Sequence, residues 1–335
     1  MPKASILMPV YNAQKTVLRS LKSLLRQDYS DFEICIINDG STDATLEVLS
    51  RFSDPRIKIY DLPENLGLVG ALNAGVAKID AKYILRLDAD DVCHEERVGR
   101  QVRFMEENPG LSLSGTWCHL IDRNQDKLLQ KVPTGNDDLK ARLYFNNPFV
   151  HPSMIFKRSV LEKYKYNTEY KHCEDYALWV ELSMDEDISF ANIPEALVYK
   201  FENRGENISH MYFEDQLRSC SILRRELLQY LGVDFSAEEM ELHDAISINA
   251  FPDQGLEIVL QRVEDWLLRL QKANNNSRRV ASGSFDFELA QRLIPVYKHA
   301  LKLGLCSADK LQSSRLISSL QPSQIRLVQS WLGSA

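Results

Sequence analysis

Residues 82–91 read "KYILRLDADD", an apolar run that ends in three carboxylates within four positions. The run predicts a buried strand, because a short apolar segment bounded by polar residues suits the interior of a sheet. The carboxylates of Asp88, Asp90 and Asp91 repel one another, so crowding them costs stability unless a positive charge lies among them. Such a triplet can be a solvated turn or a helix N-cap, or it can hold a divalent cation.

The segments before this strand alternate between strand and helix patterns. This order indicates right-handed crossovers and an α/β, Rossmann-like fold, with a mainly parallel sheet flanked by helices. In such sheets, ligands bind beyond the carboxyl ends of the strands. Polar residues gather at that edge, with Asn12 and Asp39 after earlier strands and the triplet after 82–91. We predict strands over 4–10, 32–39 and 56–62, and helices over 13–27, 44–52 and 68–79.

The pattern changes to all-helical near residue 210, after further strands and helices. The chain therefore predicts a catalytic domain over 1–210 and a helical C-terminal domain over 211–335. The apolar stripes of the C-terminal helices could bind an acceptor, form a homodimer or dock on a membrane, although such stripes are usually core. We predict a helix over 100–109, a strand over 112–122, a strand followed by a helix within 151–164, and helices over 173–184 and 255–273.

Composition is that of an ordinary globular protein, with 44% hydrophobic and 26% charged residues. The net charge of −7 argues against nucleic acid as a partner, because a protein that binds nucleic acid needs a basic surface. No secretory signal and no window of 18 uninterrupted apolar residues is visible. The six cysteines include no C-x-x-C pair, which predicts reduced thiols and no structural zinc. Reduced thiols in turn predict a cytoplasmic location. Peripheral contact with the inner face of the membrane stays open.

Several residues have two interpretations when each is taken alone. Asp39, in "NDGSTD", could accept a hydrogen bond from a base or a ribose hydroxyl, or it could stabilise a turn. Tyr11 could stack on a base or belong to the core. Asp175 opens a predicted helix, where it could cap the helix or act as a general base.

Seven fragments in order carry a family resemblance over about residues 4–209: "PVYN", "NDGSTD", "ENLGL", "ALNAG", "RLDADD", "HPSMIFKR" and "EDYALW". Together they resemble the family 2 glycosyltransferases, which are inverting enzymes with a GT-A fold and an Asp-x-Asp metal motif. The resemblance implies transfer of a hexosyl or N-acetylhexosaminyl group from a nucleotide sugar, with UDP as the expected nucleotide. The implied acceptor is a hydroxyl of a glycan or a lipid-linked molecule, in bacterial surface polysaccharide biosynthesis.

The resemblance also implies residue roles. Asp90 would be the direct ligand of Mn2+ or Mg2+, and Asp88 would also belong to the metal site, where it would contact the ribose or the metal-bound phosphate. Asp175 would be the base that takes the acceptor proton, and Glu174 would position the acceptor or the donor sugar. Trp179 would pack beneath them. In the nucleotide-sugar site, Tyr11 would stack on the base and Asp39 would bond the base. Arg86 would meet the pyrophosphate or pair with the triplet, and His151 would shape the sugar pocket. The site would further include Pro9, Val10, Asn12, Asn65, Gly67, Asn73 and Ala89.

One segment departs from the family pattern. Members often carry a histidine near "NIS" that completes the metal shell, whereas this chain reads "KFENRGENIS" over 200–209. Asn203 and Arg204 stand where that histidine is expected, and His210 lies just beyond. The metal could therefore have fewer protein ligands, or Arg204 could neutralise charge in their place.

Two other functions compete with sugar transfer. A nucleotidyltransferase shares an α/β sheet with an acidic metal site, but it usually has a glycine-rich basic loop that "PVYNAQKT" lacks. A non-catalytic sugar-nucleotide-binding protein is the other alternative. The triplet and the Glu174–Asp175 pair disfavour it, because a binding protein has no need of a base.

Overall fold

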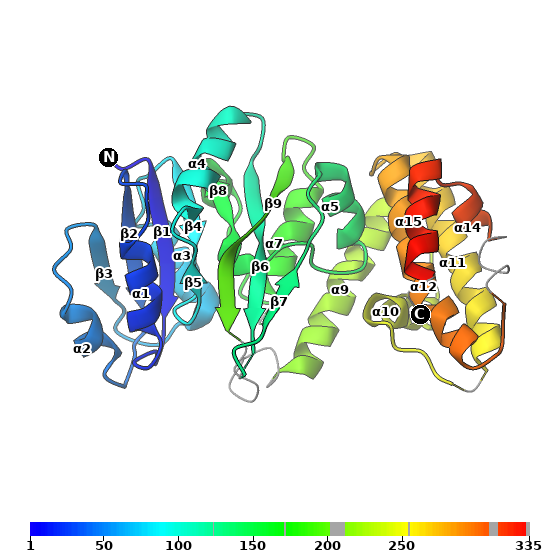
Figure 1. Cartoon of the computed structure of the whole chain (residues 1–335), viewed down its shortest axis with the longest axis horizontal. Coiled ribbons are helices and arrows are strands. Elements are labelled where there is room, and N and C mark those ends of the chain that lie inside the picture. The colour runs from blue at the N-terminus through cyan, green and yellow to red at the C-terminus, as the bar shows by residue number, and fades with distance from the viewer. Residues whose placement is uncertain (123, 171, 202–211, 254, 308–313, 333–335) are drawn as a thin grey trace. The chain divides into compact units, whose positions relative to one another are not determined.

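The computed structural model describes residues 1–335 except 123, 171, 202–211, 254, 308–313 and 333–335 (Figure 1). The chain divides into two compact units, one made of residues 1–136 and 148–220 and the other of residues 137–147 and 221–335. The division of function between domains at residue 210 stays a prediction. Residues 137–147, which lie before that boundary, pack in the second unit.

A nine-stranded sheet forms the centre of the first unit in the described part of the chain. Neighbouring strands follow the order β3-β2-β1-β4-β8-β6-β9-β5, and β7 pairs with β6. The strands are β1 (Ala4–Val10), β2 (Phe32–Asn38), β3 (Ile57–Asp61), β4 (Tyr83–Arg86), β5 (Val92–Cys93), β6 (Leu113–Ile121), β7 (Lys127–Gln130), β8 (Ile155–Lys157) and β9 (Phe190–Phe201).

The N-terminal half of the sheet is parallel, as the alternating pattern predicts. β1 pairs in parallel with both β2 and β4, and β2 pairs in parallel with β3. β1 is buried along its whole length, which explains why it reads as an uninterrupted apolar run. The predicted strand over 82–91 ends at Arg86, so the acidic triplet lies in the turn after β4.

The complete sheet is mixed rather than mainly parallel. β8 runs antiparallel to β4 and β6, β5 runs antiparallel to β9, and β7 runs antiparallel to β6. Strand direction depends on long-range pairing, which a local pattern does not encode. Because Ile155 at the start of β8 faces Leu85 near the end of β4, His151 is carried to the edge where the triplet lies.

The twelve-residue strand β9 was not predicted, because Pro194 interrupts its apolar pattern. The structure accommodates this proline at an irregularity in the ladder. Thr116 of β6 pairs with Ile193 and the next residue, Trp117, pairs with Ala196, so Pro194 has no partner on β6. A bulge of this kind lets a strand carry a residue that cannot donate to the ladder.

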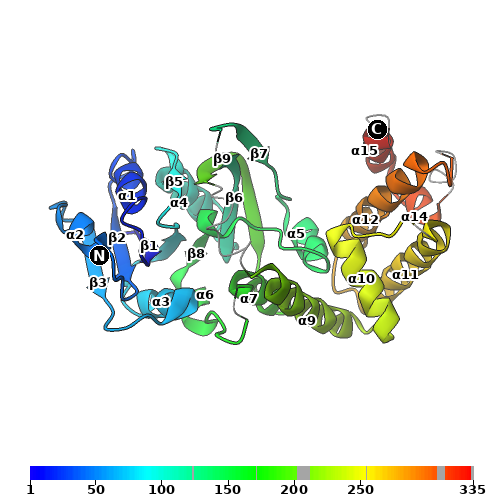
Figure 2. The ribbon, with the colours of Figure 1, turned by 90° about the horizontal axis from the view of Figure 1, so that it is seen from below.

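Helices cover both faces of the sheet (Figure 2). α1 and α4 pack with Ile6 and Met8 on one face, whereas α3 packs on the other, where a side chain at Gly75 would collide with Leu7. This alternation along β1 follows from the period of two in a strand. The helices of this unit are α1 (Val17–Leu25), α2 (Thr45–Ser50), α3 (Gly67–Val76), α4 (Arg97–Glu107), α6 (Arg158–Lys163), α7 (Glu174–Ser183) and the first turns of α9 (Phe213–Leu231), with a 3-10 turn at His151–Ser153.

The second unit is helical in its described residues, which confirms the predicted C-terminal helical region. α5 joins it through the carbonyl of Tyr144, which lies 2.8 Å from His243 Nε2. The buried carboxylate of Glu288 pairs with Arg142 at 2.9 Å and Arg292 at 2.6 Å. Besides α5 (Asn136–Leu143), its helices are α10 (Ala237–Ile248), α11 (Leu256–Ser277), α12 (Ser282–Lys302), α14 (Arg315–Ser318), α15 (Pro322–Leu332) and the rest of α9.

Across the described residues, none of the helices combines the length and the apolar character that crossing a bilayer requires.

Candidate functional site

The loops that follow β1 and β2 are tied together at the carboxyl edge of the sheet. Asn12 has a left-handed backbone with φ 48°. Its Oδ1 accepts the Thr42 N–H at 2.9 Å, and its own N–H donates to Ser41 Oγ at 3.0 Å. Pro9 and Val10 are buried within β1, whereas the Tyr11 side chain is 51% exposed. Tyr11 is therefore available to a ligand at this edge, and the side chain of Val10 belongs to the core.

Asp39 is buried and supports the start of α3. Its Oδ1 accepts the Leu66 N–H at 2.8 Å. Burial raises the pKa of this carboxyl, and the N–H groups of Leu66 and Gly67 oppose that shift. Gly40, the next residue, approaches the Asn65 backbone so closely that a Cβ would lie 2.8 Å from its nitrogen. The two loops thus meet through a position that only glycine can occupy.

Asn65 and Gly67 shape the entry to α3. The Asn65 Oδ1 accepts the Gly67 N–H at 3.0 Å. Gly67 has φ 73°, and a side chain there would meet nothing within 4 Å. Its backbone conformation, rather than contact with the protein, therefore accounts for glycine at this position.

The acidic triplet converges, because possible ligand oxygens of Asp88, Asp90 and Asp91 all lie within 4.8 Å of one another. Burial, followed by the charge of Asp88, raises the pKa of Asp90 to about 6. The same two causes raise the pKa of Asp91 well above its ordinary value. The folded chain therefore holds these carboxylates together at an electrostatic cost.

The positive charge beside the triplet comes from Arg86, which is 3% exposed. Its Nη1 lies 2.5 Å from Asp88 Oδ2, so the predicted pairing with the triplet is present. Among the described residues, Arg86 Nε and Asp91 Oδ2 are buried without a hydrogen-bond partner. A buried donor and a buried acceptor left unpaired are costly, so this place suits an anion beside Arg86 and a cation beside Asp91.

The backbone of the acidic turn is held by α1. Arg19 Nη2 donates to the Asp90 carbonyl at 2.7 Å, and Ser20 Oγ donates to the Ala89 carbonyl at 2.8 Å. The Ala89 side chain packs against the core beneath α1. These contacts orient the turn from behind and leave the carboxylates to face one another. The sequence did not point to Arg19 or Ser20, since they lie in an ordinary amphipathic helix.

The Glu174–Asp175 pair opens α7, as predicted. Glu174 is 7% exposed, and burial followed by the charge of Asp175 raises its pKa to about 7. The charges of Arg86 and Asp88 also act on Glu174, which places it within electrostatic reach of the acidic turn. Asp175 Oδ1 accepts the Tyr176 N–H at 2.7 Å. Both carboxylates therefore belong to the same polar region, and Asp175 also satisfies a backbone N–H in the first turn of its helix.

His151 packs with Tyr166 and Trp179, and these three side chains form a wall whose composition the sequence did not predict. Its Nε2 is 2.9 Å from the Tyr166 hydroxyl, and its ring contacts Trp179 edge to face at 6.0 Å. Burial and the nearby charge of Arg86 lower the pKa of His151 well below its usual value, so the imidazole is neutral. The amide of Asn73 bonds to the Tyr166 backbone through Nδ2 at 2.8 Å and Oδ1 at 3.1 Å. Asn73 thus supports this wall through Tyr166, a residue that no sequence motif identifies.

The segment "KFENRGENIS" lies mostly outside the described residues. Asn203, Arg204 and His210 all fall within 202–211, so their expected roles stay predictions.

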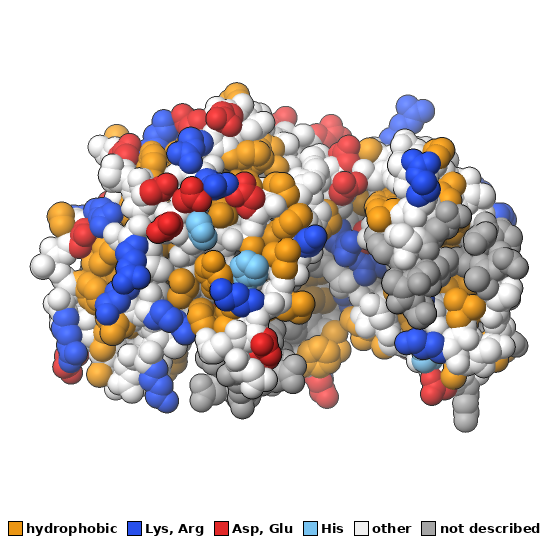
Figure 3. All heavy atoms as spheres, in the orientation of Figure 1, with side chains coloured by type: hydrophobic (Ala, Val, Ile, Leu, Met, Phe, Trp, Pro, Cys, Tyr) orange, Lys and Arg blue, Asp and Glu red, His pale blue; other side chains and the backbone are white. Residues whose placement is uncertain are grey.

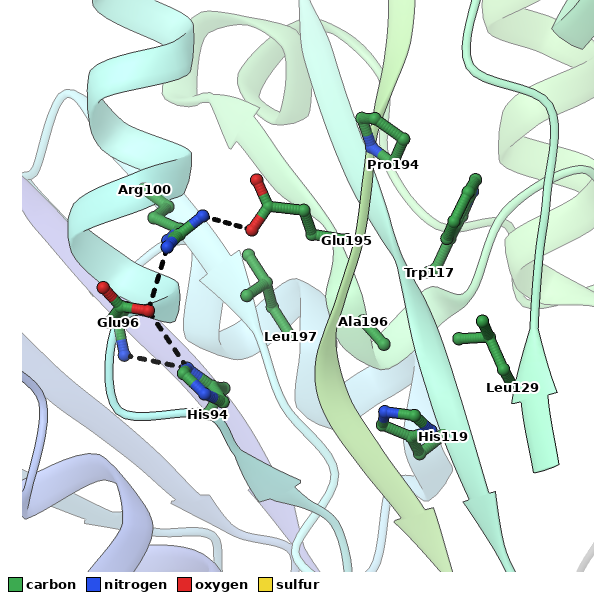
Figure 4. A pocket seen from close by; sticks show the side chains of 10 residues that line it. All are labelled: His94, Glu96, Arg100, Trp117, His119, Leu129, Pro194, Glu195, Ala196 and Leu197. Atoms are coloured by element: carbon green, nitrogen blue, oxygen red, sulfur yellow. Dashed lines mark hydrogen bonds and ion pairs between the residues drawn. The ribbon is translucent and has the colours of Figure 1, made fainter. Parts of the chain in front are cut away.

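A separate hollow of about 430 Å³ opens on the sheet face beside α4 (Figure 4). The Arg100 guanidinium pairs there with both Glu96 and Glu195. Figure 3 shows acidic, basic and histidine side chains gathered on this face. None of the predicted site residues lines the hollow, so we assign it no part in donor binding. Its lining consists of His94, Glu96, Arg100, Trp117, His119, Leu129, Pro194, Glu195, Ala196 and Leu197.

Known proteins resemble this chain in sequence. The model of the family described as glycosyl transferase family 2 matches residues 5–165. An uncharacterized glycosyltransferase of Haemophilus influenzae is 32% identical over 250 residues, which cover 70% of this chain and 76% of that protein. The O-antigen biosynthesis glycosyltransferase WbnJ of Escherichia coli is 33% identical, over 63% of this chain and 84% of that protein. The amylovoran biosynthesis glycosyltransferase AmsE of Erwinia amylovora is 31% identical, over 58% and 74%.

Solved structures share the fold at low sequence identity. Residues 1–349 of Staphylococcus aureus TarS, in complex with UDP-GlcNAc, match with a TM-score of 0.58 and 17% identity, covering 90% of this chain and 92% of that chain. The mannosyltransferase PcManGT of Pyrobaculum calidifontis, in complex with GDP-Man and Mn2+, matches with a TM-score of 0.52 and 14% identity, over 98% and 83%. These matches confirm the GT-A-like fold, and with the sequence relatives they show that the chain belongs to glycosyl transferase family 2.

Proposed function

We propose that this glycosyltransferase is a metal-dependent inverting enzyme that moves a hexosyl or N-acetylhexosaminyl group from a UDP-sugar to a hydroxyl of a glycan or lipid-linked acceptor. The observation that carries the proposal is the convergence of three carboxylates within 4.8 Å beside buried Arg86. The neighbour TarS in complex with UDP-GlcNAc supports UDP, and the relatives WbnJ and AmsE support surface polysaccharide biosynthesis. We place the enzyme in the cytoplasm, and contact with the inner face of the membrane is one of the candidate roles of its C-terminal helices.

The residues of the acidic turn fit a hard divalent cation. Such ions prefer carboxylate oxygens, and here Asp90 and Asp88 offer them at the mouth of the turn. Asp91 Oδ2, buried and unpaired among the described residues, adds negative charge that a cation would neutralise. A cation bound here would neutralise a diphosphate and stabilise it as a leaving group. Mn2+ or Mg2+ fits this set of ligands, and the neighbour PcManGT supports Mn2+.

The chain's own groups bind and orient the donor. The Nε of Arg86, which has no hydrogen-bond partner within the described part of the chain, can donate to a pyrophosphate oxygen, since a guanidinium suits phosphate. Tyr11 can stack on the base from its exposed position, and Asp39 can accept a hydrogen bond from it. The neutral imidazole of His151 forms part of the wall against which the sugar would lie.

Asp175 is the proposed general base. It would take the proton of the acceptor hydroxyl as that oxygen attacks the anomeric carbon opposite the leaving diphosphate. A single displacement inverts the carbon, and no protein nucleophile is needed. Glu174, buried beside Asp175, would position the acceptor or the donor sugar.

A thermal-shift comparison tests the choice of ligand. UDP with Mn2+ is expected to raise the melting temperature by a few degrees, because a ligand that binds only the folded state stabilises it. Each nucleoside triphosphate with Mn2+ is expected to raise it less. A larger shift with a triphosphate than with UDP would favour the nucleotidyltransferase alternative, which none of the described features of the site favours.

Glu174 provides a test of the buried charge that needs no substrate. Its pKa of about 7 exceeds the ordinary 4.5, so the folded state binds the proton more tightly than the unfolded state does. The stability that protonation confers is present below about pH 4.5 and is lost as the pH rises through about 7. Glu174→Gln, which stays neutral, is therefore expected to be more stable than wild type at pH 8, by up to about 3 kcal/mol in unfolding free energy. Its melting temperature should be correspondingly higher.

The matched control for this prediction is pH 4.5, where Glu174 is neutral in the folded protein and the difference should fall to a small part of its value at pH 8. Calorimetric melts in EDTA from pH 4.5 to 8 measure it. A Gln variant that melts below wild type at pH 8 would show that the charged form of Glu174 is stabilised in the fold.

The C-terminal helices have three candidate roles, which are acceptor binding, homodimer formation and membrane contact. Size measurement by light scattering, with and without vesicles, separates the second and third of these.

A further inference from the structure

The thiols of Cys173 and Cys220 contact each other at the start of α7, where Cys173 immediately precedes the Glu174–Asp175 pair. Their Sγ atoms are 3.0 Å apart, within hydrogen-bonding distance for sulfur. Cys173 is buried and occupies the N-cap of α7, while Cys220 lies in α9 and is half-buried. The two helices lie side by side at this point (Figure 2).

The same face of α9 makes two further contacts with this segment. Gln216 Nε2 donates to the His172 carbonyl at 3.0 Å, and the Tyr212 ring stacks on His172 with centroids 4.0 Å apart. Tyr212 directly precedes α9, and it is spaced four residues from Gln216, which is four residues from Cys220, so the three lie on one side of the helix. His172 has φ 63°, a backbone conformation that a residue with a side chain rarely adopts. The start of α9 therefore holds the two residues that precede Glu174.

We propose that Cys173 and Cys220 are a redox modification site, at which a reversible disulfide ties α9 to the start of α7 and lowers the rate of sugar transfer. The effect on transfer rests on the function proposed above. Disulfides in the cytoplasm are usually transient and redox-sensing, which suits a pair that is not part of a structural framework.

The oxidant is a peroxide, and the chemistry balances in two steps. Cys220 sulfur attacks one oxygen of hydrogen peroxide, the O–O bond breaks, and a sulfenic acid and one water form. Cys173 sulfur then attacks Cys220 sulfur, which expels the sulfenic oxygen as a second water. Two S–H bonds are lost, one S–S bond forms, and the peroxide is reduced to two waters. A small thiol reverses the change by exchange through a mixed disulfide.

The environments of the two sulfurs determine this order of events. The hydrogen bond with Cys220, together with burial, raises the pKa of the Cys173 thiol, so Cys173 is a poor first nucleophile. Cys220 is the more accessible of the two and meets the oxidant first. Once it is oxidised, Cys173 already lies in contact, so ring closure needs little motion.

The disulfide has a geometric consequence for the carboxylates. An S–S bond is about 2.05 Å long, so the sulfurs must approach by about 1 Å from their present separation. That movement pulls on the N-cap of α7 and hence on Glu174 and Asp175. A displacement of about 1 Å at catalytic groups can cost about a hundredfold in rate, and we expect a loss of roughly ten- to a hundredfold here.

The test uses the full chain, first reduced and then treated with hydrogen peroxide. Peptide mapping by mass spectrometry is expected to find a Cys173–Cys220 linkage in wild type and in the control Cys306→Ser, which lacks another half-buried thiol. Transfer should fall in both proteins and return with dithiothreitol. In Cys220→Ser and Cys173→Ser the rate should be the same before and after peroxide.

Two results would overturn the proposal. One is the absence of the linkage under conditions that oxidise Cys306, and the other is full linkage with an unchanged rate. Mapping needs no sugar donor, so the linkage is measured even if no transferase activity is found. A mapped linkage without any transfer would leave the modification site standing and count against the proposed function instead.

Discussion

Asp175→Asn is expected to lower kcat by about 10²- to 10⁴-fold, the usual contribution of a positioned general base. An amide cannot take the proton of the acceptor hydroxyl. The asparagine Oδ1 can still accept the Tyr176 N–H that Asp175 accepts at 2.7 Å, so the helix start should be retained. Binding of UDP with Mn2+ should stay within about twofold of wild type, because the proposed role lies with the acceptor. Steady-state kinetics and calorimetry on the same preparation measure both quantities.

Glu174→Gln is the matched comparison, because Glu174 is adjacent and has a pKa of about 7 that would also suit a base. If Asp175 is the base, the Asn variant loses its rate at every pH, whereas the Gln variant keeps part of it. If Asp175→Asn retains substantial turnover and Glu174→Gln does not, the base is Glu174. The pH profile of kcat/KM for each variant would then show which carboxyl titrates.

Asp90→Ala is expected to weaken metal-dependent UDP binding by at least about tenfold. Two groups of this turn, Asp88 and Asp91, would remain, but the ion would lose one of its carboxylate ligands. Without metal the variant should be as stable as wild type or more stable, since the pKa of Asp90 is raised to about 6 and its charge is held at a cost. Calorimetric titration with UDP, in Mn2+ and in EDTA, measures the effect.

Asp187→Ala is the control for this variant, because Asp187 is an exposed aspartate in the loop between α7 and β9. It should bind UDP as wild type does in Mn2+. Equal UDP affinity in wild type and Asp90→Ala would remove Asp90 from the metal site. Equal affinities in Mn2+ and EDTA for wild type would remove the metal requirement itself.

Local patterns predicted the half of the sheet that surrounds the acidic turn. β1, β2 and β4 are short, largely apolar runs followed by polar residues, and their parallel pairing brings those residues to one edge. Asn12, Asp39 and the triplet could therefore be placed together without knowledge of distances. The pairing of Arg86 with Asp88 also follows from their proximity in the chain.

The remainder of the site depends on contacts between distant segments. Tyr166 meets Asn73 and His151 across three separate elements, and no spacing in the sequence encodes that meeting. Arg19 looks like any exposed residue of an amphipathic helix until its contact with the Asp90 carbonyl is seen. The strand β9 was not predicted, and only the ladder with β6 shows how the chain accommodates Pro194 within it.

The acidic turn has consequences for how this chain can diverge. Residues 87–91 are anchored by β4 before them and β5 after them, and α1 fastens the carbonyls of Ala89 and Asp90. Because both ends of this segment are fixed, inserting or deleting a single residue would move the three carboxylates away from one another. Variation in sugar preference among descendants should therefore arise by substitution around an unaltered turn length. Insertions should accumulate in loops whose ends are not fastened in this way.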